Sequence, residues 1–134
     1  MQTRVLSVRT GSRPAVVDLT RDVADFVKPL GDGLLAVFVP HATAGVAILE
    51  LGSGSDDDLL SALDELLPAE DRYQHSHGSV GHGRSHVMPA FIAPSVVIPV
   101  MEGRLTLGTW QSIALVDLNV DNASRSVRLS FLEG

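Results

Sequence analysis

The sequence predicts an α+β fold, a largely antiparallel sheet or sandwich that carries two amphipathic helices. Short apolar or alternating segments, which are typical of strands, occupy most of the chain, and two stretches show helical periodicity. Most of the predicted strands are joined by short turns, which favours antiparallel pairing because parallel strands need long crossovers. No linker, repeat or low-complexity tract interrupts the chain, so we expect a single domain over residues 1–134.

The predicted strands differ in how they are expected to be buried. In RSVRLSFL, the last of them, apolar and polar residues alternate, as in a strand with one buried face. LLAVFVP, by contrast, is an apolar run that is expected to be buried on both faces. Glu102-Gly103 predicts a hairpin turn, and Asp121 and Asn122 predict a turn before the last strand. The predicted strands span residues 4–10, 16–19, 34–40, 44–51, 95–100, 104–110, 111–118 and 125–132.

Two segments have the apolar spacing of amphipathic helices. The first has Thr20 as its expected N-cap and ends before Gly31. The second has Ser55 or Asp56 as its expected cap and ends at Pro68, and acidic residues in its first turn favour the positive end of the helix dipole. The predicted buried stripes are Val23, Phe26, Val27 and Leu30 in the first helix, and Leu59, Leu63, Leu66 and Leu67 in the second.

Composition excludes several classes of protein. The chain has 134 residues and no cysteine, so it has neither a disulfide framework nor a thiolate metal site. Its formal net charge is −6 and its arginines are scattered, which argues against a nucleic-acid partner because phosphate binding needs clustered cations. No apolar run approaches the roughly 20 residues of a membrane helix, and the N-terminal segment lacks the apolar core of a signal peptide. We therefore expect a cytoplasmic protein with no membrane partner.

Four of the five histidines lie in YQHSHGSVGHGRSH, residues 73–86, which overlaps a polar, Gly-rich and aperiodic segment that spans residues 68–85. His75 and His77 are two residues apart, so they point the same way if the segment is extended. His82 and His86 are four apart, and glycines and serines between the pairs allow the chain to bend. Three imidazoles with an open fourth position form a catalytic zinc pattern. A solvated loop that merely contains histidines is the alternative.

Two further residues are candidates for acid–base chemistry. His41 follows a predicted strand and Pro40, and catalytic groups are often placed by strand ends. Glu50 ends the apolar segment GVAILE, where burial would raise its pKa and suit it to act as a base or metal ligand. The alternatives are a hydrogen-bonded histidine at a strand terminus and an exposed carboxylate at a sheet edge.

The segment GRLTLGTWQS holds the only tryptophan. Trp110 offers a flat face to a substrate ring, and Gln111 offers both a donor and an acceptor. The alternative is that Trp110 is a core aromatic with a polar neighbour on the outer face.

Several segments together carry a resemblance to a known family: HATAG, AILE, LLPAEDRYQHSHG and SHVMPAFIAPSVVIPVMEGRLTLGTWQSIALVD. They resemble the YjbQ-like family, small proteins named for a secondary, weak thiamine-phosphate synthase activity. The resemblance is clearest from His41 to Asp117, and the order of elements agrees throughout. It implies a jelly-roll-like antiparallel β-sandwich with helices packed outside, assembled as a homotrimer, and a site at subunit contacts would fit that trimer.

The resemblance also implies a set of site residues. The catalytic candidates are His41, Glu50 and His86, and the substrate-binding candidates are Thr43, Trp110 and Gln111. The metal-ligand candidates are His75, His77 and His86, joined by His82. His82 stands where the family usually has Asn, which favours metal binding in this chain. Leu49 and Leu51 stand where the family has Asn on both sides of its Glu, which makes the surroundings of Glu50 more apolar.

Three functions follow as hypotheses. The first is the family-type synthase, a transferase that joins a pyrimidine-methyl diphosphate to a thiazole phosphate and needs magnesium or basic groups for the diphosphate. The second is a zinc-dependent hydrolase or lyase, since imidazole suits zinc better than magnesium. The third is a non-catalytic module that captures a small anion or metabolite. Each implies a small-molecule partner, phosphorylated in the first case.

Overall fold

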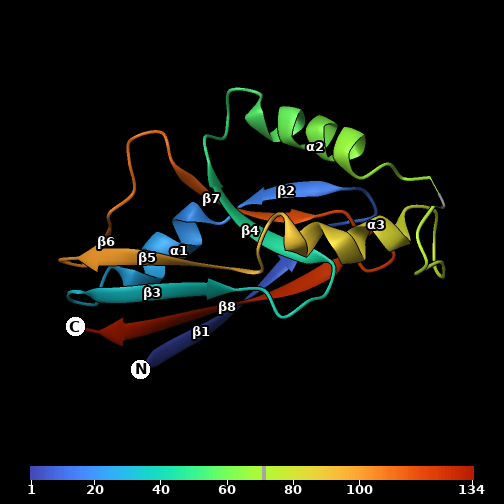
Figure 1. The fold of residues 1–134 in the computed structure, drawn as a ribbon. Coiled ribbons are helices and arrows are strands. Elements are labelled where there is room, and N and C mark those ends of the chain that lie inside the picture. Colours follow the sequence, from blue (N-terminus) through green and yellow to red (C-terminus); the bar gives the residue numbers. More distant parts are fainter. Residues whose placement is uncertain (71) are drawn as a thin grey trace.

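A computed structural model describes residues 1–70 and 72–134. Its strands form two antiparallel sheets (Figure 1). The five-stranded sheet has the order β1-β8-β3-β5-β6, and the three-stranded sheet has the order β2-β7-β4. The predicted α+β class with antiparallel strands is confirmed, and the two sheets form a sandwich-like arrangement. The jelly-roll topology stays a prediction. The strands are β1 (Gln2–Arg9), β2 (Ala15–Asp18), β3 (Gly33–Phe38), β4 (Ala44–Leu49), β5 (Ser95–Met101), β6 (Arg104–Leu105), β7 (Ser112–Asp117) and β8 (Ser124–Glu133).

Both predicted helices are present. They are α1 (Thr20–Val27) and α2 (Ser55–Leu66). Thr20 is not the cap of α1 as predicted, because the helix begins at Thr20 itself and Leu19 stands at the N-cap; the Thr20 hydroxyl accepts a hydrogen bond from the Ile113 backbone N–H at 2.9 Å. Gly54, with a left-handed φ of 96°, precedes α2 in place of the predicted cap. Of the stripe predicted for α2, Leu66 is wrong: its side chain is 54% exposed.

A third helix lies within the segment that was expected to be a loop. Helix α3 (His82–Val87) is followed by a 3₁₀ turn, η1 (Met88–Ala90). The aperiodic loop therefore ends at Gly81, four residues earlier than predicted. Glycines hide the helix from pattern reading because they lower helix propensity. Figure 1 places α3 beyond the ends of β4 and β7, on the side away from the β5–β6 hairpin.

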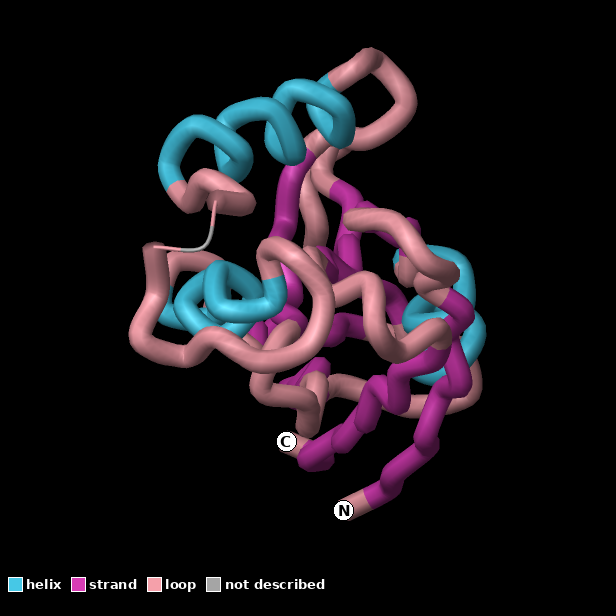
Figure 2. The backbone as a smooth tube through the Cα atoms, turned by 90° about the vertical axis from the view of Figure 1, so that its right-hand side faces the viewer, coloured by secondary structure: helices cyan, strands magenta, loops and turns pink. Residues whose placement is uncertain are grey.

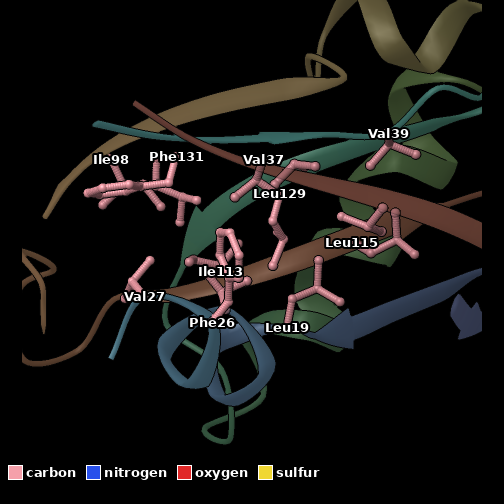
Figure 3. Packing of buried hydrophobic residues seen from close by; sticks show 14 of the residues in the cluster. Leu19, Phe26, Val27, Val37, Val39, Ile98, Ile113, Leu115, Leu129 and Phe131 are labelled. Atoms are coloured by element: carbon pink, nitrogen blue, oxygen red, sulfur yellow. The ribbon is translucent and has the colours of Figure 1, made fainter. Parts of the chain in front are cut away.

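The main core lies between the two sheets and α1. Apolar side chains of β3, β7 and β8 meet those of α1 there, as Figure 3 shows for Phe26, Leu115 and Leu129 among others. A second apolar cluster joins α2 to the opposite face of β7 and to η1, and comprises Leu63, Leu67, Met88, Val116 and Leu118. Strand β7 is thus buried on both faces. Figure 2 shows the resulting layers, with α2 on the outside of the three-stranded sheet.

The outer face of the five-stranded sheet is open. Strand β3 was expected to be buried on both faces, and this is wrong: Leu35 and Val37 are buried, but Leu34 and Phe38 are 47% and 41% exposed. An open antiparallel face is normally polar, whereas this one carries an apolar stripe across four strands. We call it the open-face stripe. It consists of Val5, Leu34, Phe38, Val97, Met101 and Leu132.

Among the helices of residues 1–70 and 72–134, none combines the length and the apolar character needed to cross a membrane.

Candidate functional site

The four clustered histidines lie together where the long loop enters α3. His82 is the first residue of the helix and His86 follows one turn later, so both rings lie on one face of it. His75 and His77 come from the preceding loop, which turns through left-handed conformations at Gly78 and Gly81, with φ of 78° and 87°. The His75 ring stacks on that of His86 with 4.0 Å between centroids.

Three of these rings converge on one point. The ligand atoms of His75, His82 and His86 all lie within 4.8 Å of one another, and the two Nε2 atoms of His82 and His86 are 3.0 Å apart. Around a tetrahedral zinc with Zn–N bonds of about 2.0–2.1 Å, two nitrogens lie about 3.3 Å apart. The nitrogens of His82 and His86 therefore have nearly this spacing. The widest separation in the group, up to 4.8 Å, has to shorten by about 1.5 Å to reach it.

His77 lies beside this group without joining it. Its ring centroid is 4.3 Å from that of His75 and 4.6 Å from that of His82, but 6.4 Å from that of His86. The ring is exposed and lines a hollow of about 70 Å³ together with Glu70, Tyr73 and Ser79. This volume holds a few water molecules or a small hydrated ion, whereas pockets for drug-sized ligands occupy about 300–1,000 Å³.

The absence of a side chain at Gly83 brings the loop and helix together. A Cβ atom at this position would lie 2.4 Å from the His75 carbonyl oxygen and 2.7 Å from Tyr73 Cβ. Any larger residue would push the loop away from α3. Gly83 therefore sets the distance between His75 and His86.

The electrostatic surroundings favour the uncharged form of two of the rings. Burial lowers the pKa of His86 below its usual 6.5, and the neighbouring His75, His82 and His77 lower it further. Desolvation likewise lowers the pKa of His75, as do His77 and His82. A metal ligand must be neutral imidazole, so both shifts keep a lone pair available near neutral pH.

Two polar contacts hold α3 in place. The Arg84 guanidinium, which is buried, forms an ion pair with Asp64 of α2 and donates a hydrogen bond to the Leu67 carbonyl at 3.2 Å. At the start of the helix, His82 Nδ1 lies 3.0 Å from Asp121 Oδ2 in the turn between β7 and β8. The first half of the helix that carries His82 and His86 is thus fixed to α2 and to the turn after β7.

His41 is not part of the three-histidine group. Its Nε2 accepts a hydrogen bond from the Ser126 backbone N–H at 2.9 Å, which matches the strand-terminus alternative. Burial is the main cause that lowers the pKa of His41; nearby Arg125 lowers it further, while Asp117 opposes the shift. Arg125 and Asp117 form an ion pair that is almost completely buried.

Thr43 lies at the start of β4 and is connected to the histidine cluster through hydrogen bonds. Its Oγ1 accepts a bond from Asn119 Nδ2 at 3.4 Å, and Asn119 Oδ1 accepts one from the Asp121 backbone N–H at 2.9 Å. Asp121 in turn contacts His82. Thr43 therefore supports the turn next to the cluster.

Glu50, Trp110 and Gln111 lie at the other end of the same sheet. Strand β4 pairs with β7 so that Leu49 faces Ser112, which brings the residues just beyond both to one edge. The six residues of β4 separate this edge from Thr43 by about 20 Å at 3.3–3.4 Å per residue. Within one chain, the predicted site residues are therefore divided between two ends of β4.

The surroundings of Glu50 and Trp110 show whether each side chain is buried or exposed. Glu50 is exposed, and its Oε1 accepts a hydrogen bond from Ser53 Oγ at 3.2 Å, so the expectation of a buried carboxylate is wrong. Trp110 is 73% exposed, so it is not a core aromatic. Gln111 Oε1 accepts a bond from the Gly108 backbone N–H at 2.8 Å, which closes the turn before β7.

A groove of about 430 Å³ opens beside Gln111, between α1 and the β5–β6 hairpin. It is lined by apolar and charged side chains, among them Leu105, Leu107, the cations Lys28 and Arg104, and the carboxylate Asp25. The volume falls within the range of small-molecule sites. The substrate-sized groove and the histidine cluster thus lie near opposite ends of strand β7.

Comparison with known proteins identifies the family. The family model described as UPF0047 protein YjbQ-like matches residues 4–134. The chain belongs to the YjbQ-like family. UPF0047 protein Rv2556c of Mycobacterium tuberculosis is 62% identical to this YjbQ-like chain over 134 residues, which is all of both chains. UPF0047 protein YugU of Bacillus subtilis is 32% identical, with 82% of this chain and 84% of the relative covered.

Solved structures show the same fold. A hypothetical protein of Aeropyrum pernix K1 aligns over 100% of both chains with 35% identity and a TM-score of 0.90. A structure from Sulfolobus solfataricus, described as a YbjQ-like protein of unknown function, aligns over 99% of this chain and 97% of its own with 27% identity and a TM-score of 0.92. The predicted membership of the family is confirmed.

Sequence reasoning missed two features of this YjbQ-like chain. Asp121 was assigned only to a turn, although its carboxylate contacts His82. The buried pair of Asp117 and Arg125 was also missed, because scattered charges on strands are usually solvated. The spacing of His82 and His86 held the signal for α3, since residues four apart share a helix face.

Proposed function

We propose that this YjbQ-like chain is a zinc-dependent hydrolase or lyase that acts on a small molecule, with His75, His82 and His86 as the ligands. The observation that carries the proposal is the convergence of these three ligand atoms within 4.8 Å. Three histidines with an open fourth position are the donor set of catalytic zinc. Imidazole nitrogen suits zinc, whereas magnesium and calcium prefer oxygen.

Zinc bound there would supply Lewis acidity to an oxygen atom of the substrate or of water. The chain's own residues would do the rest. His77 is exposed beside the group and lines the hollow, so it is placed to accept or donate a proton. Glu50 cannot take this role from within the same chain, since β4 separates it from the cluster.

The first experiment measures zinc. Elemental analysis and zinc titration of the purified chain should give one ion per chain, and His75→Ala, His82→Ala and His86→Ala should each weaken binding strongly. His41→Gln is the matched control, because His41 is hydrogen-bonded to Ser126 outside the group. It should bind zinc as the unmodified chain does. If the unmodified chain holds no zinc and shows no affinity on titration, the assignment is wrong.

We also propose that the chain works as a homotrimer, as the family resemblance implies. Two observations support assembly. The open-face stripe leaves apolar side chains uncovered on four strands, and contiguous exposed apolar surface marks interaction sites. Glu50, Trp110 and Gln111 lie about 20 Å along β4 from Thr43, so only a second copy can bring the two groups together.

Light scattering of the purified chain tests the mass of the assembly, and Phe38→Asp should lower that mass. A monomer would contradict the proposal.

Thiamine-phosphate synthase activity is a second candidate function. It is favoured by Trp110, in the turn before β7, and by the groove beside that turn. The Trp110 indole is exposed and available to stack on a pyrimidine. Lys28 and Arg104, which line the neighbouring groove, are the cations that a diphosphate needs, and magnesium as the accompanying ion would be offered the nearby Asp25 carboxylate.

The synthase assay follows thiamine phosphate formed from the two phosphorylated precursors with magnesium. Trp110→Ala and Arg104→Gln should lower the rate, while Arg13→Gln, an exposed arginine away from the groove, should not. A rate at background in the unmodified chain would exclude this activity. Binding of phosphate with neither turnover nor zinc would indicate a non-catalytic binding module.

A further inference from the structure

The carboxylate of Asp121 receives three contacts from the segment that carries the histidines. Its Oδ2 lies 3.0 Å from His82 Nδ1 and accepts a hydrogen bond from the Ser79 backbone N–H at 3.2 Å. Its Oδ1 accepts a bond from the Ser79 hydroxyl. An aspartate carboxylate is ordinarily an anion near neutral pH, so in all three contacts it accepts.

The contact with Asp121 determines which nitrogen of His82 carries the proton. Because an ionised carboxylate cannot donate, His82 Nδ1 must be the N–H of this pair. In the neutral ring, His82 Nε2 then has a lone pair. That lone pair faces His86 Nε2 at 3.0 Å and is directed into the three-histidine group. The tautomer set by Asp121 is the one that zinc ligation through Nε2 requires.

The position of Asp121 is itself fixed by buried neighbours. Its backbone N–H donates to Asn119 Oδ1 at 2.9 Å, and the Asn119 backbone N–H donates to Asp117 Oδ1 at 2.8 Å. Asn119 and Asp117 are buried at the end of β7. The carboxylate is therefore presented to His82 by the rigid end of a central strand.

Ser79, Asp121 and His82 do not form a nucleophilic triad. In such a triad the serine hydroxyl bonds the histidine and the carboxylate lies behind the ring. Here the Ser79 hydroxyl bonds the carboxylate itself, and the free side of His82 faces another histidine. The arrangement matches instead the carboxylate–histidine pairs that orient ligands in metal sites.

We propose that Asp121 is a positioning residue of the metal site, which fixes the tautomer and orientation of His82 so that its Nε2 completes the group with His75 and His86. This role rests on the proposed zinc site and adds to it a residue outside the ligand set. In known metal sites, loss of such a partner weakens metal affinity by about 10–100-fold. The same loss is expected here.

The test compares zinc affinity in four variants of the full chain. Asp121→Ala and Asp121→Asn should bind zinc about 10–100-fold more weakly than the unmodified chain. Asp57→Asn removes an exposed carboxylate on α2 and controls for net charge. Ser79→Ala removes the hydroxyl bond to the same carboxylate but keeps the contact with His82. Both controls should stay within about twofold of the unmodified chain.

A second measurement reads the tautomer directly in the metal-free protein. Long-range ¹H–¹⁵N spectra of the imidazoles should show His82 protonated on Nδ1 in the unmodified chain and in Ser79→Ala. In Asp121→Ala the proton should move to Nε2, which is the preferred tautomer of a free histidine side chain. A role that only anchors the loop would not separate Ser79→Ala from Asp121→Ala.

The outcomes distinguish the two proposals. Tight zinc binding by the unmodified chain with unchanged affinity in Asp121→Ala overturns the role of Asp121 alone. Equal loss in Ser79→Ala and Asp121→Ala also overturns it, because loop anchoring then explains the effect. No zinc binding by the unmodified chain overturns the metal site and the positioning role together.

Discussion

The buried ion pair of Arg125 and Asp117 gives a prediction whose size follows from the structure. The two side chains are 1% and 0% exposed. In Arg125→Met, the carboxylate keeps one hydrogen bond, from the Asn119 backbone N–H, and loses its counterion. Breaking a buried pair by removing one partner costs about 3–5 kcal/mol. This is a large part of the roughly 5–15 kcal/mol by which a domain is stable.

The effect should depend on pH in a direction fixed by Asp117. Burial raises the pKa of this carboxyl above its usual 3.8, and the Asn119 N–H and Arg125 oppose that shift. Without Arg125 the pKa should rise further. Between the unfolded value and the raised folded value, the folded chain binds more protons than the unfolded chain, so its stability falls as the pH rises. The difference from the unmodified chain should therefore shrink at acid pH.

Urea unfolding at several pH values, followed by circular dichroism, measures this effect. Arg72→Met is the matched control, because Arg72 and Glu70 form a pair 2.8 Å apart whose side chains are 55% and 74% exposed. An exposed pair contributes about 0–1 kcal/mol. The double variant Arg125→Met with Asp117→Asn should recover part of the loss. If Arg125→Met costs no more than Arg72→Met, the reasoning from burial is refuted.

Three further predictions concern packing, spacing and protonation. Gly83→Ala should weaken zinc binding about tenfold or more, because a Cβ would meet the His75 backbone. Gly31→Ala is the control, since no atom lies within 4 Å of its Cβ position, and it should bind zinc as the unmodified chain does. Equal zinc affinities in the two variants would contradict the role of Gly83. Leu63→Ala should lower the free energy of unfolding by about 2–5 kcal/mol, and the 54%-exposed Leu66, changed to Ala, by about 0.5 or less; similar losses would be inconsistent with the packing of α2. Because the folded pKa of His86 is below 6.5, the folded chain binds fewer protons than the unfolded chain as the pH falls through that value. The free energy of unfolding, measured with urea, should therefore fall as the pH drops below 6.5. A rise would refute the lowered pKa of His86.

Local patterns predicted most of the fold. Alternation identified β8, and the Glu102-Gly103 turn identified the β5–β6 hairpin, since both depend on neighbours in sequence. The burial of β3 was wrong because apolar content does not tell which face is covered. In the structure the strand with two covered faces is β7, which α2 packs against. Coverage depends on tertiary packing, which a single segment does not encode.

The candidate site divides in the same way. The clustering of His75, His77, His82 and His86 could be predicted because all four are close in sequence. The contact between His82 and Asp121 could not, because it spans 39 residues and depends on the turn after β7. Glu50 and the histidines were expected to be neighbours, but the register of β4 with β7 places them apart within one chain.

The histidine cluster comes from a single stretch of twelve consecutive residues, 75 to 86. The entropy of closing a loop grows with its length, at about 0.6 kcal/mol for each doubling. Bringing these rings together therefore costs little even in an unfolded chain, in contrast to the bond between His41 and Ser126, which spans 85 residues. An ion would also bind the unfolded chain, and binding to that state reduces the stabilisation that a ligand gives. Zinc should accordingly raise the melting temperature by less than its affinity for the folded chain implies, and a peptide of residues 73–87 should retain part of that affinity.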